Sequence, residues 1–172
     1  MMIFGLNINY VKFVYSSMQQ KTVMITAVRT NASHTHFVEL VKQLDVDLAI
    51  RDGRDHDFYN QFNKIDAIRF AVVAYDADKP VGCGTIKEYN ASAVEVKRMF
   101  TLPAYRGKGV ATKVLKELES WAEELGYKSC ILETGKKQPE AIELYKKNNY
   151  KLIPNYGQYT GVENSVCFVK IL

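Results

Sequence analysis

The chain has 172 residues, of which 47% are hydrophobic and 24% are charged, and its formal net charge at pH 7 is +4. This length suits one globular domain, and the near-average apolar share excludes a disordered tail protein. Cys83, Cys130 and Cys167 are too few for a disulfide scaffold and lack the Cys-x-x-Cys spacing of a metal site. Lysines and glutamates interleave, most densely over 113–124, so the mild positive charge does not indicate a nucleic-acid partner.

The first twenty residues are apolar and aromatic, but Lys12 interrupts them and no basic segment precedes them. This pattern argues against a secretory signal peptide, and no apolar run approaches the roughly 20 residues that a membrane helix needs. We therefore expect a cytoplasmic protein with reduced thiols and no membrane partner. Because Met18 and Met24 precede the first clean strand pattern, we predict an extension over 1–22 and a domain over 23–172.

The first half of the chain predicts a strand, two helices and an antiparallel meander. Residues 23–29 are short and β-branched, as in a strand, and 30–33 offer N-cap candidates for a helix. Apolar residues then recur at helical spacing up to about Asp45. A second helix near 58–62 is ambiguous, because aspartates surround it. Three strands joined by turn residues are expected at 68–75, 81–89 and 93–101.

After Pro103 the hydrophobic period lengthens to three and four residues. An apolar stripe that includes Trp121 predicts a long helix from Val110 to Leu125, and Gly126 stands where a helix C′ residue belongs. The remaining elements are a strand, a helix and two strands, at 129–133, 140–148, 150–153 and 165–172. The order β-α-α-β-β-β-α-β-α-β-β indicates a single-domain α/β fold, whose mixed and mostly antiparallel sheet has a parallel central pair flanked by helices.

A glycine-rich loop, Arg106-Gly107-Lys108-Gly109-Val110-Ala111-Thr112, joins a strand to the long helix. Glycines let the backbone curl tightly, and the first N–H groups of a helix have no intrahelical acceptor. Together with the helix dipole and the two basic side chains, this loop can cradle a pyrophosphate. A basic surface turn that merely begins a helix is the alternative. The segment fits neither a Walker A loop nor a dinucleotide-binding fingerprint.

The residues from Met99 to Ala111 resemble the acetyl-coenzyme-A-binding motif of the GNAT superfamily of N-acetyltransferases. The core of that motif is Q/R-x-x-G-x-G/A, which Arg106, Gly109 and Ala111 meet. The second family motif, N-x-x-A-x-x-L-Y-x-x-x-G-F/Y, resembles the segment that follows from residue 138 to residue 150. The likeness covers about residues 23–172, and both motifs occur at the right spacing.

Two residues depart from the family pattern. Gln138 stands where the family usually has Asn, which puts one hydrogen bond to the pantetheine arm in question. Asn149 replaces the usual Gly after the helix. We expect that turn to survive, because Asn tolerates the left-handed conformation better than other non-glycine residues.

The resemblance implies a GNAT-like fold that uses acetyl-CoA as a co-substrate. It implies that a splayed strand pairs by backbone groups with the pantetheine amides, and that a backbone N–H there polarises the thioester carbonyl. The glycine loop would hold the pyrophosphate. The residues expected to bind acetyl-CoA are Met99, Phe100, Thr101, Arg106, Gly107, Lys108, Gly109, Val110, Ala111, Thr112, Gln138 and Ala141.

Acetyl transfer to an amine needs a base for the ammonium proton and an acid for the departing thiolate. Tyr145 matches the general-acid tyrosine of the family, whereas the residues alone favour a core tyrosine. Glu95 is the candidate base, since strand alternation places it on one face with Lys97 and Met99; a surface Glu95–Lys97 pair is the alternative. Glu133 is the second candidate, as base or as an anchor for the acceptor, where the parallel strands should part.

The function expected from these patterns is transfer of an acetyl group from acetyl-CoA to a primary amine of a small molecule, by direct attack in a ternary complex. A non-catalytic acyl-CoA-binding sensor and a protein N-terminal or lysine acetyltransferase are the alternatives. His34 and His36 are spaced for capping or surface roles, so no metal is expected. The aromatic and glycine-rich segment 155–161 fits either a wall of the acceptor site or a homodimer contact.

Overall fold

The computed structural model describes residues 24–53, 56–61 and 68–172, so the predicted extension over 1–22 lies outside the described residues. The element order within these ranges matches the predicted order. The helices are α2 (Thr35–Asp52), α3 (His56–Asn60), α4 (Val110–Glu124) and α5 (Pro139–Lys147). The strands are β1 (Ile25–Thr30), β2 (Phe70–Asp76), β3 (Lys79–Asn90), β4 (Ala93–Thr101), β5 (Ser129–Gly135), β6 (Lys151–Ile153) and β7 (Ser165–Ile171). Short 3₁₀ helices lie at Pro103–Tyr105 and Gly157–Tyr159.

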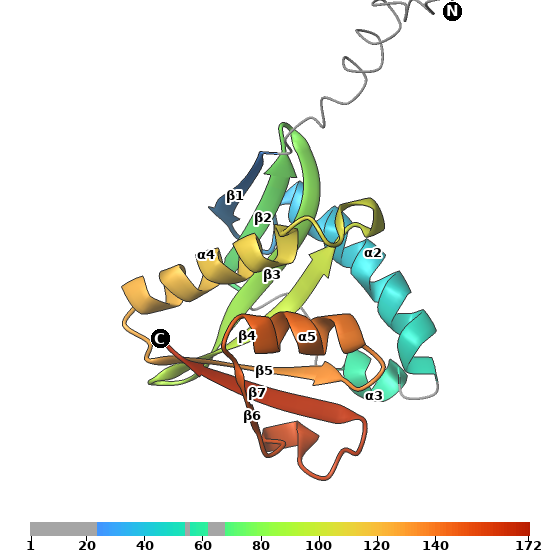
Figure 1. Ribbon diagram of the computed structural model, residues 1–172, viewed down its shortest axis with the longest axis vertical. Coiled ribbons are helices and arrows are strands. Elements are labelled where there is room, and N and C mark those ends of the chain that lie inside the picture. The colour runs from blue at the N-terminus through green and yellow to red at the C-terminus, as the bar shows by residue number, and fades with distance from the viewer. Residues whose placement is uncertain (1–23, 54–55, 62–67) are drawn as a thin grey trace, which may run out of the picture.

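The described strands form one seven-stranded sheet in the order β1-β2-β3-β4-β5-β7-β6. Neighbouring strands run antiparallel except β4 and β5, which are parallel. This confirms the prediction of a mostly antiparallel sheet with one central parallel pair. The parallel pairing covers only three residues on each strand, from Ala93 opposite Ser129 to Glu95 opposite Ile131. Beyond this point β4 and β5 diverge (Figure 1).

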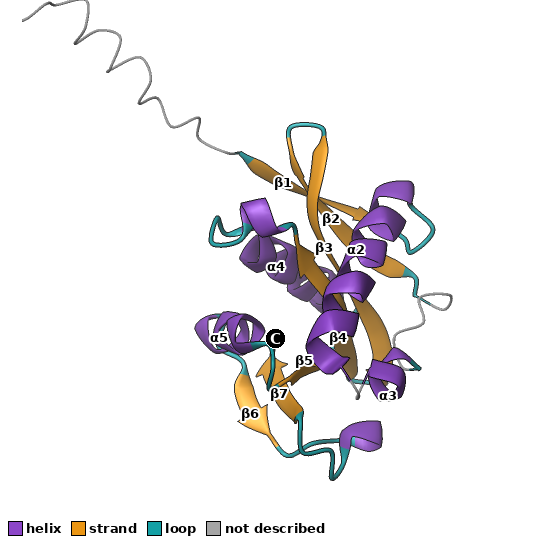
Figure 2. Ribbon diagram, turned by 90° about the vertical axis from the view of Figure 1, so that its right-hand side faces the viewer, coloured by secondary structure: helices purple, strands orange, loops and turns teal. Residues whose placement is uncertain are grey.

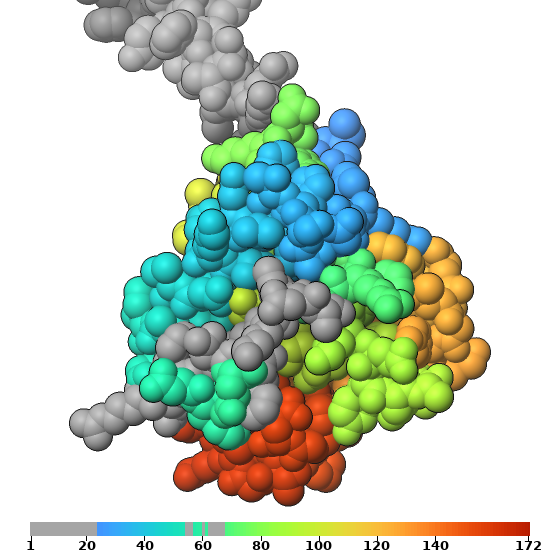
Figure 3. All heavy atoms as spheres, turned by 180° about the vertical axis from the view of Figure 1, so that it is seen from behind, coloured from blue at the N-terminus to red at the C-terminus, as the bar shows by residue number. Residues whose placement is uncertain are grey.

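Helices cover both faces of the sheet (Figure 2). The apolar stripe of α4 is buried on one face, where it packs in a cluster that also includes Tyr145 of α5. On the opposite face α2 packs in a second cluster with residues of β2, β3 and β4. The view from behind shows α2 and α3 over this second face, above the C-terminal segment (Figure 3). The sheet is therefore the middle of three layers, as expected when both faces are apolar.

Helix α2 extends further than its sequence pattern indicates. The prediction that this helix ends at about Asp45 is wrong, because α2 continues to Asp52. The aspartates that suggested a loop are held by arginines: Asp45 pairs with Arg98 of β4 at 2.7 Å, and Asp47 pairs with Arg51 at 3.2 Å. One ion pair with a distant strand and one i,i+4 pair within the helix thus stabilise a helical segment that local propensity would have ended.

The N-terminal boundary of α2 also differs from the prediction. The residues over 30–33 do not cap the helix; its N-cap is His34, whose side chain makes no capping hydrogen bond. Asn31 instead accepts a hydrogen bond from the Ser33 amide at 3.0 Å, in a turn that precedes the helix. Short polar side chains close such local turns as readily as they cap helices.

The exit from α5 confirms the expectation for Asn149. This residue has φ 68°, in the left-handed region that the family's glycine would occupy. The amide of Tyr150 donates to the carbonyl of Tyr145, and the Asn149 amide donates to that of Lys146, each at 3.1 Å. The turn therefore satisfies carbonyl groups at the helix end without a glycine.

Candidate active site

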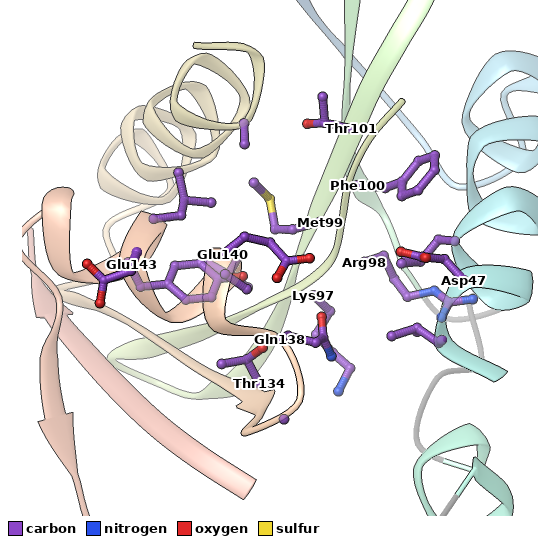
Figure 4. Close-up of a pocket in the computed structure, with 18 of the residues that line it drawn as sticks. Asp47, Lys97, Arg98, Met99, Phe100, Thr101, Thr134, Gln138, Glu140 and Glu143 are labelled. Carbon is purple, nitrogen blue, oxygen red and sulfur yellow. The ribbon is translucent and has the colours of Figure 1, made fainter. Parts of the chain in front are cut away.

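A cavity of about 600 Å³ opens where β4 and β5 diverge. Residues of α2, α4 and α5 form its other walls (Figure 4), and residues of the glycine loop also line it. Because the two strands stop pairing after Glu95 and Ile131, the edge of β4 that faces β5 has no strand partner from there to Thr101. That edge is the splayed strand that the resemblance implies.

A β-bulge at Arg98 sets which side chains of β4 face each wall. Cys83 of β3 pairs with Phe100 and Thr85 pairs with Lys97, so β4 has one extra residue, and Arg98 adopts φ 57°. Met99 consequently packs in the cluster around α4, whereas Phe100 packs in the cluster around α2. In Figure 4 the side chains of Met99 and Arg98 point to opposite sides of the strand.

The bulge overturns one sequence expectation. Simple alternation placed Met99 on one face with Glu95 and Lys97, and this is wrong because the extra residue reverses the pattern after Lys97. The partner strand accommodates the reversal with a glycine. A Cβ at Gly84 would collide with the Met99 sulfur and would lie 2.9 Å from Val114.

The glycine loop leads directly into the first turn of α4. Gly107 and Gly109 have φ 75° and 80°, and Gly109 is the N-cap of the helix. The first intrahelical bond runs from the Lys113 amide to the Gly109 carbonyl at 3.0 Å. The amides of the first turn therefore have no intrahelical acceptor, and the residues over 109–112 line the cavity. This geometry fits an anion such as a pyrophosphate.

The two basic side chains of this loop lie in different places. Arg106 lines the cavity, where its guanidinium donates to the Thr101 carbonyl and to Asp47 at 3.3 and 3.2 Å. Lys108 is not among the residues that line the cavity, and its ammonium lies 5.0 Å from the centre of the Tyr105 ring. The structure thus brings together the predicted donor-binding residues except Lys108. It includes Gln138 and Ala141, which lie where α5 begins.

Tyr145 lines the cavity from α5 and is only 5% exposed. Its ring packs against those of Tyr150 and Phe168, with centroids 5.7 and 6.0 Å apart. Burial raises the pKa of the phenol above its usual value, and the nearby charge of Glu133 raises it further. The hydroxyl therefore keeps its proton at neutral pH. Tyr145 is buried, as a core tyrosine would be, and also lines the cavity, and its role as the general acid stays a prediction.

Glu95 and Lys97 form a buried pair at the wall of the cavity. The ammonium of Lys97 lies 3.5 Å from one carboxylate oxygen of Glu95, and both side chains are 10% exposed. Tyr156 donates its hydroxyl proton to the other oxygen at 3.0 Å. Lys97 also donates to the Tyr159 hydroxyl at 3.3 Å. Glu95 and Lys97 therefore line the cleft, as the first interpretation expects, and also form an ion pair, as the second expects. That ion pair is buried and not on the surface.

Glu133 lies across the cavity, on β5. Burial raises the pKa of this carboxyl to about 7, and the charges of Glu95 and Asp52 raise it as well. A hydrogen bond with Ser165 and the charge of Lys97 act in the opposite direction. Its Oε1 atom is buried without a hydrogen-bond partner. Glu133 is therefore a carboxyl that changes charge near neutral pH, with one oxygen free to accept a proton.

Sequence reasoning missed three residues of this site: Arg98, Tyr156 and Tyr159. Arg98 was assigned no role, and only the bulge brings it to the cavity. The aromatic segment 155–161 was recognised, but its two interpretations stayed open. Tyr159 lines the cavity and Tyr156 holds Glu95, which places the segment at the wall of the site.

The three cysteines are free and buried. Burial raises the pKa of Cys83 and of Cys130 to about 12, and that of Cys167 to about 11. Thiols with such pKa values are poor nucleophiles. No cluster of potential metal ligands occurs among the described residues, and no helix in that part of the chain is long and apolar enough to cross a membrane.

This cavity thus combines a helix N-terminus whose open amides fit a phosphate-bearing ligand with the ionisable side chains of Glu133 and Tyr145. Residues 38–150 match the Acetyltransferase (GNAT) family, and the chain belongs to this family. It is 34% identical over 101 residues to the uncharacterised N-acetyltransferase YsnE of Bacillus subtilis (strain 168), a match that covers 58% of this chain and 67% of YsnE. It is 37% identical to the IAA acetyltransferase of Azospirillum brasilense over 54% of this chain and 60% of that protein.

Solved structures share the fold over most of the chain. A protein from Klebsiella pneumoniae subsp. pneumoniae MGH 78578, provisionally named an acyl-CoA N-acyltransferase, is 25% identical with a TM-score of 0.72, covering 87% of this chain and 99% of that one. A GNAT family acetyltransferase from Elizabethkingia anophelis, solved with acetyl-CoA bound, is 16% identical with a TM-score of 0.63, covering 86% and 98%. The second likeness is one of fold alone.

Family membership makes the chain an acyltransferase with acetyl-CoA as its co-substrate, which confirms the predicted family, fold, enzyme class and co-substrate. The residues present fit this donor. Its pyrophosphate matches the open amides of residues 109–112, and its pantetheine amides match the unpaired edge of β4 beyond Glu95. When bound, the donor supplies an activated acetyl thioester.

Replacing Gly109 with Ala tests the cradle at the start of α4. A Cβ at φ 80° costs roughly 1–2 kcal/mol, so the backbone should rotate and misdirect the amides of the first turn. We expect acetyl-CoA to bind at least about tenfold more weakly, equivalent to ~1.4 kcal/mol, in a calorimetric titration. Gly126→Ala is the matched control, because Gly126 has φ 91° beyond the other end of α4, and a Cβ added at either glycine would meet no other atom within 4 Å.

Both variants should lose similar stability in urea denaturation, since the backbone strain is similar. Only Gly109→Ala should lose affinity. Equal affinity for acetyl-CoA in the two variants would show that the loop is a surface turn and not a donor-binding cradle.

Proposed function

We propose that this chain transfers the acetyl group of acetyl-CoA to a primary amine of a small molecule, by direct attack within a ternary complex. The observation that carries the proposal is the position of Glu133. This carboxyl has a pKa of about 7 and a free oxygen, and it shares one cavity with Tyr145 and with the amides at the start of α4. A proton acceptor near neutrality is what an ammonium substrate requires.

Strand β4 and helix α4 position the donor. The unpaired edge of β4 over residues 99–101 offers backbone groups to the pantetheine amides, and the first turn of α4 offers its amides to the pyrophosphate. A backbone N–H of β4 polarises the thioester carbonyl. Fixing both reactants in this way supplies rate through orientation.

Glu133 is the better base of the two glutamates, which reverses the order in which the sequence ranked them. Both oxygens of Glu95 are engaged, one by Tyr156 and the other by Lys97. Glu133 has a free oxygen, and the raised pKa makes it a stronger base than an ordinary carboxylate. In this proposal Glu133 takes the ammonium proton, and Glu95 holds Lys97 and Tyr156 at the wall of the cavity.

Tyr145 is the proposed acid. Its phenol is protonated at neutral pH, and its place at the cavity wall lets it donate that proton to the departing thiolate. Tyr145 and Glu133 line the same cavity, and the charge of Glu133 raises the pKa of the Tyr145 phenol. One cavity thus holds a group that accepts a proton and a group that donates one.

A small acceptor is supported by the size and burial of the cavity, whose volume of about 600 Å³ must also hold the reactive arm of the donor. Similar proteins include an IAA acetyltransferase and an aminoglycoside 6′-N-acetyltransferase, both named for small acceptors. A cytoplasmic location stays part of the proposal, supported by the three free cysteines.

The proposed function is tested by measuring CoA release from acetyl-CoA with a panel of small amines, amino-terminal peptides and lysine peptides. We expect turnover with small amines and none with the peptides, because a cavity of about 600 Å³ that also holds the arm of the donor leaves room for only a small acceptor. Melting curves of the protein with and without acetyl-CoA are recorded alongside this assay. Stabilisation by acetyl-CoA without turnover of any amine would favour the sensor, and turnover of peptides alone would favour a protein acetyltransferase.

Glu133→Gln tests the base. Below pH 7 the wild-type carboxyl is protonated and cannot accept a proton, so kcat/KM should rise with pH around 7. The glutamine variant should lose this inflection and roughly 10²-fold or more in kcat/KM. Glu95→Gln is the comparison variant, which should keep the inflection. An inflection that persists in Glu133→Gln and disappears in Glu95→Gln would reverse the assignment.

Tyr145→Phe tests the acid. The variant keeps the ring that packs on Tyr150 and Phe168 but has no proton to donate, so we expect kcat to fall by about 10²-fold with little change in acetyl-CoA affinity. Tyr150→Phe is the matched control, because Tyr150 is a buried ring that packs against Tyr145 and does not line the cavity. Equal turnover in the two variants would remove Tyr145 as the acid.

A further inference from the structure

Three side chains that line the cavity have buried polar atoms without a hydrogen-bond partner. They are Arg98 through Nε and Nη1, Thr101 through Oγ1 and Glu133 through Oε1. Buried polar groups in folded proteins are nearly always paired, because an unpaired one costs free energy. In a substrate cavity such atoms are natural partners for the polar groups of a substrate, and here they include one cation and one carboxyl.

Arg98 is the least explained of the three. It is 8% exposed, its backbone adopts φ 57° at the bulge, and its Nη2 donates to Asp45 at 2.7 Å. The remaining guanidinium nitrogens, Nε and Nη1, carry N–H groups on different edges of the plane and have no acceptor among the described residues. A guanidinium cannot lose its charge to relieve this deficit.

The acidic side chains of Asp47 and Glu140, which also line the cavity, already pair with other arginines. Asp47 is shared between Arg51 and Arg106 at 3.2 Å from each, and Glu140 pairs with Arg51 at 2.5 Å. Asp45 supplies a single contact to Arg98, and its side chain is 44% exposed. No acceptor for Nε and Nη1 exists among the described residues, so an anionic group that enters the cavity would complete the shell of Arg98.

We propose that the acceptor of this enzyme is an amino carboxylate, whose carboxylate binds Arg98 while its amine is directed to Glu133; this inference rests on the proposed function. Glu133 and Arg98 belong to different strands, β5 and β4, on either side of the gap between them. The site thus presents an acidic and a basic partner to one ligand, which matches the two charges of a zwitterion. A carboxylate can accept from the unpaired N–H groups of Arg98, and a single negative charge suits an arginine already partly neutralised by Asp45.

The proposal is tested first on the wild-type enzyme with matched acceptors. L-Amino acids, β-alanine and 4-aminobutyrate are compared with their carboxamides, and with phosphoethanolamine as a phosphate-bearing amine. We expect kcat/KM to be at least tenfold higher for the best carboxylate than for its amide. This comparison needs no variant, so it is independent of the contribution of Arg98 to folding.

Arg98→Gln and Arg98→Lys then test the residue. The Gln variant should lose the carboxylate preference, and the Lys variant should restore part of it, since lysine keeps the positive charge. Acetyl-CoA affinity should not change in either variant. Asp45→Asn is the matched control, because it removes the ion pair and leaves the Arg98 charge in the cavity.

Equal kcat/KM for carboxylates and amides in the wild type would overturn the inference and leave the proposed function standing. The inference would also fail if phosphoethanolamine were preferred, or if Arg98→Gln lowered activity equally for both acceptor types. If no amine is turned over, the proposed function fails by itself. Melting shifts of the CoA-loaded chain with the same acids and amides would then decide whether Arg98 binds a carboxylate.

Discussion

The separation of β4 from β5 after only three paired residues is the feature on which the site depends. A continuous parallel ladder would satisfy the backbone groups of both strands and leave no room between them. Because the ladder ends at Glu95 and Ile131, β4 keeps an open edge and β5 carries Glu133 to the other side of the gap. The same opening lets the first turn of α4 and the side of α5 face one cavity.

The bulge at Arg98 changes which face of the sheet each side chain of β4 contacts. Before the bulge, Glu95 and Lys97 lie with the aromatic wall of Tyr156 and Tyr159. After it, Met99 turns toward the core around α4, and Arg98 itself pairs with α2. An extra residue in one strand re-aims side chains in this way, and bulges are common beside active sites.

Burial raises the pKa values of ionisable side chains that line the cavity. Taking Glu133 out of water disfavours its charged form and brings its pKa to about 7, while burial keeps the Tyr145 phenol protonated. In the same surroundings it costs free energy to leave guanidinium N–H groups without acceptors. The unpaired Nε and Nη1 of Arg98 therefore indicate which kind of ligand the cavity binds. The raised pKa values of Glu133 and Tyr145 and the unpaired N–H groups of Arg98 thus share one physical origin, the limited access of water to these side chains.

Local sequence determined the order of the elements, the stripe of α4, the glycine loop and the left-handed turn at Asn149, because periodicity and backbone preference act over a few residues. The two motifs also identified the family and its donor. Tertiary structure decided the length of α2, the face of Met99, the role of the aromatic segment and the partners of Glu95, Glu133 and Arg98. These depend on strand register, on ion pairs between distant residues and on burial, none of which a local pattern specifies.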